Sequence, residues 1–239
     1  LDDAEQQPSA AGAADHTAAT TAQLLSTARL LEAVAPVTIT DNLLGARWSQ
    51  IAWESVVEPL SFLAGARIGE ISRHPFVQQL ALETLTEAVE VARAAEVTLE
   101  RLPGAPDLIQ LALSTEERGP APLPQSAIDK RNWLGAVAGR YGRVHSRLLL
   151  TAERGAAVVP RANEHVSAVG KKVGVGTPRQ QGLAAAVRRR VERGEKPGLH
   201  LLQQVYARGV DKPLEARAAT APTDEPPAPA EELPASSVL

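Results

Sequence analysis

Two glutamates four residues apart, Glu54 and Glu58, are the side chains of this sequence best placed to do acid–base chemistry. Residues at this spacing lie on one face of a helix, with Cβ atoms about 5–6 Å apart. Two carboxyl groups this close can share a proton or bind an amine. The alternative is a solvated helix face, or ion pairs with Arg47 or Arg67. Both interpretations place two negative charges on one stretch of helix.

Metal-binding and nucleophilic signals are weak in this chain. It has 5 histidines and no cysteine, which excludes disulfides, thiolate metal sites and thiol nucleophiles. No histidine pairs with another four residues away or belongs to a His-Glu-x-x-His arrangement, so we predict no metal site. His145 directly precedes Ser146, and it can act either as a proton donor or as an ordinary surface or capping histidine.

Two further segments imitate ligand-binding motifs. The run Gly174-Val175-Gly176-Thr177 looks like a glycine-rich phosphate loop, but no lysine precedes Thr177, and a turn that ends a helix explains the glycines. The run Arg188-Arg189-Arg190 is basic, yet the net charge of the chain is -3 and aromatic residues make up only 3% of it. We therefore expect a solvated helix face and no nucleic-acid partner.

The elements that must position these residues are predicted to be helices, because apolar residues recur with a helical period. An apolar stripe covers residues 24–34. We expect the next helix to run from about Leu43 to Ala64, with Asp41 as its N-cap and Pro59 inside it. No segment shows the alternating pattern of several strands, so we predict an all-α fold. Further helices are predicted after His74-Pro75, around 158–173, and from Thr177-Pro178 to Gly194.

Composition divides the chain into three parts. Residues 1–21 are small and polar and are predicted to be a flexible lead-in, whereas 22–206 form the helical domain. Residues 207–239 contain six prolines and few large apolar groups, so we predict a disordered Pro/Ala-rich tail. No apolar run is long enough to span a membrane. No signal peptide is recognisable, so a cytoplasmic location is expected. Since the chain has no methionine, we expect that Leu1 is not its translation start.

Three segments of the chain contain residues whose types and spacing match those of a known family. They are DNLLGARWSQIAWE at 41–54, EAVEVARA at 87–94, and a fixed spacing of Asn163, Gly170, Gly174, Val175, Thr177 and Pro178. The last one matches, without gaps, the Asn-Gly…Gly-x-x-x-Gly-Val-x-Thr-Pro pattern of ketopantoate reductases (2-dehydropantoate 2-reductases). Ser146 precedes Asn163 by 17 residues, as the serine of that family does. Over residues 22–206 the chain thus resembles the C-terminal helical domain of these enzymes and of 6-phosphogluconate dehydrogenases.

The resemblance implies an NADPH-dependent oxidoreductase of pantothenate biosynthesis with two domains. An N-terminal domain holds NADPH, and the helical domain binds the small-molecule substrate, here through Ser146 and Asn163. A lysine protonates the developing alkoxide, while asparagines orient the substrate. No Gly-x-Gly-x-x-Gly follows a strand in this sequence, so NADPH would have to be held by a domain that this chain lacks.

The catalytic positions depart from the family pattern. Gln50 stands where the family has its lysine, Glu54 and Glu58 stand where it has asparagines, and Val158 stands where it has a glutamate. Glutamine cannot protonate an alkoxide, and general acid catalysis is worth about 10²–10⁴-fold in rate. Two charges about 4 Å apart interact by about 4 kcal/mol at an effective dielectric constant near 20. We therefore expect a degenerate active site that repels an anionic 2-oxo acid.

Two functions remain open from the sequence. The first is the substrate-binding domain of a ketopantoate-reductase-like oxidoreductase with altered or lost activity, whose substrate is an imine or a neutral ketone. The second is a non-catalytic binding or dimerisation module that has kept the fold. The alanine-rich segment 81–95 allows close helix approach and favours a homodimer.

Overall fold

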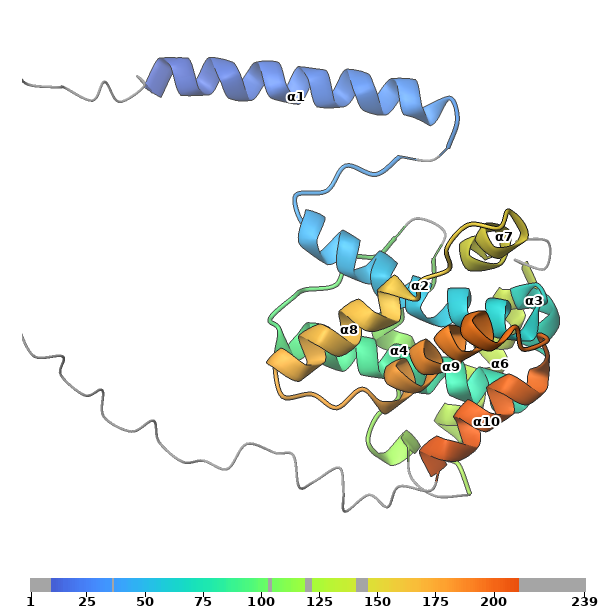
Figure 1. Ribbon diagram of the computed structural model, residues 1–239. Helices are drawn as coiled ribbons and strands as arrows, with labels where there is room; N and C mark the ends of the chain where they lie inside the picture. The colour runs from blue at the N-terminus through green and yellow to red at the C-terminus, as the bar shows by residue number, and fades with distance from the viewer. Residues whose placement is uncertain (1–9, 36, 103–104, 119–121, 141–145, 211–239) are drawn as a thin grey trace, which may run out of the picture.

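All the regular structure in the described part of the chain is helical, as predicted. The computed structural model describes residues 10–35, 37–102, 105–118, 122–140 and 146–210 (Figure 1). In chain order the helices are α1 (Ala10–Glu32), α2 (Leu43–Ala64), α3 (Ile68–Ile71), α4 (Pro75–Ala94), α5 (Leu108–Leu111), the 3₁₀ helix η1 (Glu116–Arg118), α6 (Gln125–Arg140), α7 (Arg147–Glu153), α8 (Arg161–Lys172), α9 (Pro178–Arg193) and α10 (Leu199–Val210).

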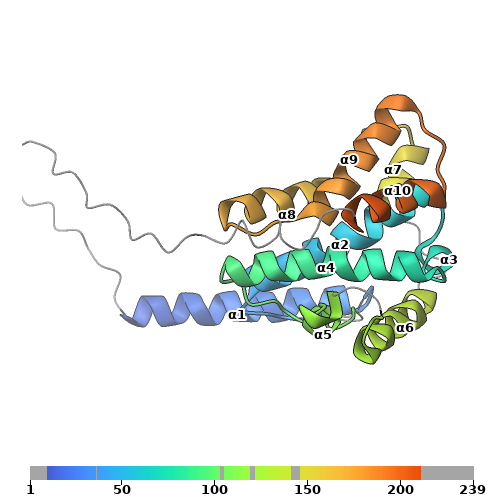
Figure 2. The same ribbon diagram turned by 90° about the horizontal axis from the view of Figure 1, so that it is seen from below.

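Helix α4 runs through the middle of the domain. Figure 2 shows it between α8 and α9 on one side and α6 on the other, and it packs closely against α2. Leu80 and Leu82 point to opposite sides of α4, and both are 0% exposed. A helix that buries side chains on opposite sides must be enclosed by other helices. Three of the alanines of segment 81–95 that we expected at a dimer face, Ala81, Ala88 and Ala92, are buried inside the domain, whereas Ala94 is exposed.

Helix α2 has the predicted bounds, but its N-cap is Asn42 and not Asp41. The Asn42 Oδ1 accepts a hydrogen bond from the Gly45 N–H at 3.0 Å, and its Nδ2 donates to the Thr98 carbonyl at 2.9 Å. An amide can accept and donate at once, whereas a carboxylate can only accept. This second bond ties the start of α2 to the segment after α4, so Asn42 is the better cap here.

The ends of the chain differ from the prediction in two respects. Helix α1 begins at Ala10, so residues 10–21 of the predicted flexible lead-in are helical. This stretch is rich in alanine, the residue with the highest helix propensity, and that propensity favours a helix even where the apolar period is missing. Helix α10 reaches Val210, four residues into the predicted tail 207–239, and the rest of that tail lies outside the described residues.

Helix α1 lies apart from the helical domain in Figure 1. Its C-terminal turns and the residues after them expose large apolar side chains, namely Leu24, Leu25, Leu30, Leu31 and Val34. Within the described residues, no helix is both long enough and apolar enough to cross a membrane.

Candidate functional site

The three predicted catalytic residues lie along one face of α2. The Gln50 Nε2 donates a hydrogen bond to the Glu54 Oε1 at 2.9 Å, one helical turn away. Glu58 follows one turn later, and its side chain is 13% exposed. The three side chains lie in one row, as their spacing predicts. Gln50 is at the exposed end of the row, and Glu58 is at the more buried end.

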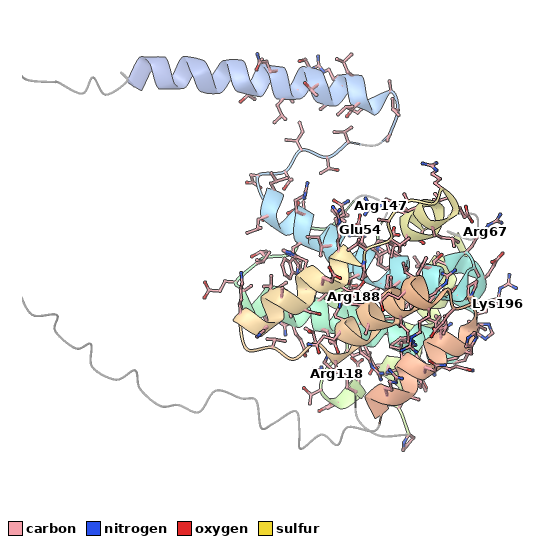
Figure 3. The ribbon with its side chains drawn as sticks, viewed as in Figure 1. Glu54, Arg67, Arg118, Arg147, Arg188 and Lys196 are labelled. Carbon is pink, nitrogen blue, oxygen red and sulfur yellow. The ribbon has the colours of Figure 1, made fainter. Side chains whose placement is uncertain are left out.

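Arg147, at the start of α7, pairs with both glutamates (Figure 3). Its Nη2 lies 2.7 Å from the Glu54 Oε2, and its Nε lies 3.7 Å from the Glu58 Oε1. The Leu148 N–H also donates to the Glu58 Oε2 at 2.7 Å. The ion-pair interpretation named Arg47 and Arg67 as partners, and the structure gives Arg147 that role. Sequence reasoning missed this arginine because it lies about 90 positions further along the chain.

A polar cavity of about 290 Å³ opens beside these residues. Its walls come from α2, from α7 and from the segment that leads into α8. Its charged residues are Glu54, Glu58, Arg147 and Arg161. The two carboxylates and two guanidinium groups cancel in formal charge, so the net repulsion expected from the sequence is offset. No lysine lines this cavity in the part of the chain that is described, and Gln50 is not part of its lining.

A second cavity, of about 200 Å³, adjoins the polar one. Most of its walls are aliphatic or aromatic side chains from α2, α3, α4 and α6. Glu58 lines both cavities. Ser146 lines the apolar one and caps α7, because its Oγ accepts a hydrogen bond from the Leu149 N–H at 3.2 Å. The structure thus places Ser146 close to Glu58, on the side of the apolar cavity.

Asn163 lies at the wall of the polar cavity but is itself 1% exposed. Its Nδ2 donates to the Ser55 carbonyl at 2.7 Å and to the Gln180 Oε1 at 2.8 Å. The Gln180 Nε2 in turn donates to the Ser55 Oγ and to the Thr84 carbonyl, at 3.0 and 2.9 Å. Both amide hydrogens of Asn163 are therefore used to join α8 to α2 and α9. Only its Oδ1 is left to meet a ligand.

Other predicted candidates contribute less to this site. His145 lies outside the described residues, so its role as a proton donor stays a prediction. Where side chains are described, no group of three or more His, Cys, Asp or Glu residues is arranged to hold a metal ion. Arg188, in the basic run, pairs with Glu164 at 2.5 Å on an exposed surface.

The glycine-containing turn before α9 does not fit a dinucleotide phosphate. Gly174 adopts a φ of 74°, in the left-handed region, and ends α8 as a turn. The first N–H groups of α9 that a phosphate would need are already used. The Arg179 and Gln180 N–H groups donate to the two oxygens of Glu87, at 2.8 and 2.9 Å. The glycines at this turn therefore end α8, as predicted, and the first N–H groups of α9 are bound to Glu87.

Glu87 makes the stability of the domain depend on pH. Burial raises the pKa of this carboxyl from 4.5 to about 8, against the lowering effects of the two N–H donors and of Arg179. The folded state then holds a proton between these pH values that the unfolded state has lost. The free energy of unfolding should fall as pH rises from about 5 to 8, by at most about 1.4 kcal/mol per pH unit from this group.

Chemical denaturation of the wild type and of Glu87→Gln across this pH range measures the effect. The difference between the two proteins should change with pH, because the variant carries no titrating group at this position. Glu192→Gln, on the exposed side of α9, is the matched control and should keep the wild-type slope. An identical slope in the wild type and in Glu87→Gln contradicts the assignment.

The fold and the cavities define an all-α domain with a polar site beside α2. Residues 42–192 match the family described as "Ketopantoate reductase PanE/ApbA C terminal", so the chain belongs to the ketopantoate reductase family as its C-terminal helical domain. No curated protein matches the chain. It is similar to the crystal structure of a PanE/ApbA family ketopantoate reductase from Ralstonia eutropha JMP134, with 22% identity and a TM-score of 0.48. The match covers 76% of this chain and 48% of that one, so this chain spans about half the length of its relative.

Proposed function

We propose that this chain is the substrate-binding helical domain of a ketopantoate-reductase-like, NADPH-dependent oxidoreductase with altered or lost activity on ketopantoate. One observation carries the proposal. The family's lysine position holds Gln50, whose amide is hydrogen-bonded to Glu54, and no described lysine lines the adjacent cavity. Arginine does not give up its proton in proteins, so Arg147 and Arg161 do not replace the lysine as acid. Among the described residues that line the cavity, reduction of a 2-oxo acid then lacks the lysine that the family uses as its proton donor.

The paired glutamates add a second reason. Arg147 is the cation nearest to the row on α2, and it is already shared between Glu54 and Glu58. Its side chain is 69% exposed, so these pairs contribute only about 0–1 kcal/mol to stability. They do, however, give an incoming carboxylate two competitors for the same guanidinium group. A substrate without a carboxylate next to the reacting carbon, such as an imine or a neutral ketone, fits this site better.

Restoring the family residues tests the proposal. In the full-length protein that contains this chain and a dinucleotide-binding domain, NADPH oxidation with ketopantoate should be slow. The triple variant Gln50→Lys, Glu54→Asn and Glu58→Asn should raise kcat/KM by about 10²-fold or more, because it restores a general acid and frees Arg147. Gln203→Lys makes the same Gln-to-Lys exchange on exposed α10 and should leave kcat/KM unchanged. Wild-type turnover that already equals that of the triple variant overturns the proposal.

The second candidate is a non-catalytic binding or dimerisation module. The exposed leucines of α1 favour it, because a row of large apolar side chains in water is typical of an interaction surface. The same assay separates the two candidates. A module should oxidise no NADPH with ketopantoate, neutral ketones or imines, even as the triple variant. We take a cytoplasmic location and a small-molecule partner as part of the enzymatic proposal.

A further inference from the structure

The apolar cavity beside α2 has walls that suit a compact hydrocarbon group. It is enclosed by side chains of α2, α3, α4 and α6, among them Trp53, Val56, Ile68, Val77 and Leu134. Its volume is about 200 Å³. A dry cavity of about 150 Å³ with similar walls is large enough to bind benzene. A branched chain of about five carbons or a phenyl ring therefore fits.

The uncharged polar side chains around this cavity are engaged within the protein. The Ser61 Oγ donates to the Ala66 carbonyl at 2.6 Å, and the Ser72 Oγ donates to the Gly69 carbonyl at 3.2 Å. The Gln78 Nε2 donates to the Ser72 carbonyl at 2.7 Å. Each of these three side chains therefore already donates a hydrogen bond to a backbone carbonyl of the protein.

Glu58 is the exception, because it is the only charged side chain among the described residues that line the apolar cavity. One of its oxygens accepts the Leu148 N–H, and the other lies 3.7 Å from the Arg147 Nε, beyond normal hydrogen-bond distance. That second oxygen retains capacity to accept a hydrogen bond. A nearly apolar cavity with one carboxylate and no cation is complementary to an amphiphilic cation.

We propose that the apolar cavity binds a primary amine that carries a compact aliphatic or aromatic group, with its ammonium group on the Glu58 carboxylate. The hydrocarbon part occupies the cavity between α2, α4 and α6. The ammonium group lies at the junction with the polar cavity, at the Glu58 oxygen that the Leu148 N–H does not use. As a statement of substrate class, this inference rests on the proposed function. As a binding site, it stands on the cavity and its charge.

Calorimetric titration of the 239-residue chain with isopentylamine and benzylamine tests the inference. Both should bind with a stoichiometry of one. Isopentanoate, which has a similar hydrocarbon part and the opposite charge, should bind at least ten-fold more weakly. Fluorescence gives a second readout, since Trp53 lines the cavity. Failure of both amines to bind, or tighter binding of isopentanoate, overturns the inference.

Variants locate the ammonium group. Glu58→Gln keeps the size of the side chain and an acceptor for the Leu148 N–H but removes the charge, so amine affinity should drop about ten-fold or more. Isopentanol, which has no charge, should bind both proteins equally. Glu164→Gln, whose glutamate pairs with Arg188 elsewhere on the surface, is the matched control and should bind amines like the wild type. Unchanged amine binding in Glu58→Gln overturns the inference. Thermal unfolding of each variant shows whether it is folded.

The outcomes for this site and for the proposed function can be told apart. If amines bind but the full-length protein shows no NADPH-dependent reduction, the proposed function is wrong and the binding site is confirmed. NADPH oxidation with neutral ketones, without amine binding, sinks only the inference.

Discussion

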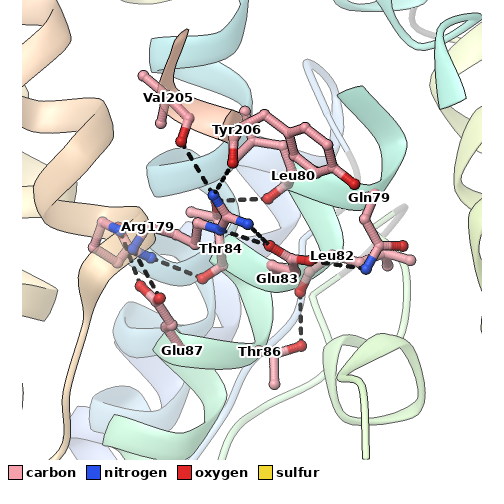
Figure 4. A network of polar contacts seen from close by, with 11 residues as sticks. Gln79, Leu80, Leu82, Glu83, Thr84, Thr86, Glu87, Arg179, Val205 and Tyr206 are labelled. Carbon is pink, nitrogen blue, oxygen red and sulfur yellow. Dashed lines mark hydrogen bonds and ion pairs between the residues drawn. The ribbon is translucent and has the colours of Figure 1, made fainter. Parts of the chain in front are cut away.

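Replacing Arg179 by methionine is expected to lower the free energy of unfolding by about 3–5 kcal/mol, because the change leaves the partly buried Glu83 carboxylate and two backbone carbonyl groups without their donor. Arg179 is 4% exposed and lies in the network of polar contacts that Figure 4 shows. Its Nε donates to the Glu83 carboxylate at 2.6 Å, and its Nη1 donates to the Val205 and Tyr206 carbonyls at 3.1 and 2.8 Å. The guanidinium group also lies 5.4 Å from the centre of the Tyr206 ring. One side chain therefore joins α9 to α4 and α10.

Urea denaturation measures this loss. Arg188→Met is the matched control, because Arg188 lies on α9 like Arg179. Its side chain is 56% exposed and pairs at the surface with Glu164 of α8. An exposed pair contributes about 0–1 kcal/mol, so the control should unfold at nearly the wild-type midpoint. If the two variants lose equal stability, the buried network does not hold α9 in the way described.

Asn163→Ala should lower the free energy of unfolding by about 2–4 kcal/mol, although the family resemblance assigns Asn163 to substrate binding. The variant leaves two buried acceptors, the Ser55 carbonyl and the Gln180 Oε1, without their donor. Each buried polar group without a partner costs about 1–3 kcal/mol. Because both amide hydrogens are used inside the protein, the loss should appear without any ligand.

The measurement is again the free energy of unfolding, with Asn132→Ala as control. Asn132 lies on the exposed face of α6, where the substitution should change stability by no more than about 0.5 kcal/mol. If Asn163→Ala has wild-type stability and binds ligands poorly, Asn163 is mainly a ligand contact and the structural role is wrong.

The parts of the fold set by local chemistry were predictable. Helix α2 has the predicted bounds, Leu43 to Ala64, and ends at Gly65, which adopts a left-handed φ of 65°. Helix α9 begins after Thr177 and ends at Gly194, as the Pro and Gly signals indicated. The helical stretch from Ala10 was missed, because its alanines carry helix propensity without an apolar period. The apolar stripe that the sequence does show, residues 24–34, covers only the C-terminal part of α1 and the residues after it.

The site was predictable only along a single helix. The common row of Gln50, Glu54 and Glu58 follows from the helical repeat, and hydrogen bonding between the first two agrees with it. The pairing with Arg147 depends on how α7 packs on α2, which no local pattern encodes. The adjacent Ser146, a good N-cap, signalled the start of a helix there. The charge balance of the cavity, which decides what it attracts, depended on the contact that the sequence did not show.

The double use of Glu58 has a consequence for how the domain responds to what it binds. The same carboxylate accepts the Leu148 N–H at the start of α7 and forms part of both cavities. An occupant that binds the second oxygen of this carboxylate draws on the same negative charge as the Leu148 N–H, so each interaction changes the strength of the other. Thermodynamic linkage makes the two effects equal in size. The free energy with which α7 is attached and the affinity of the cavity for its ligand are therefore coupled through Glu58, and a change in one changes the other.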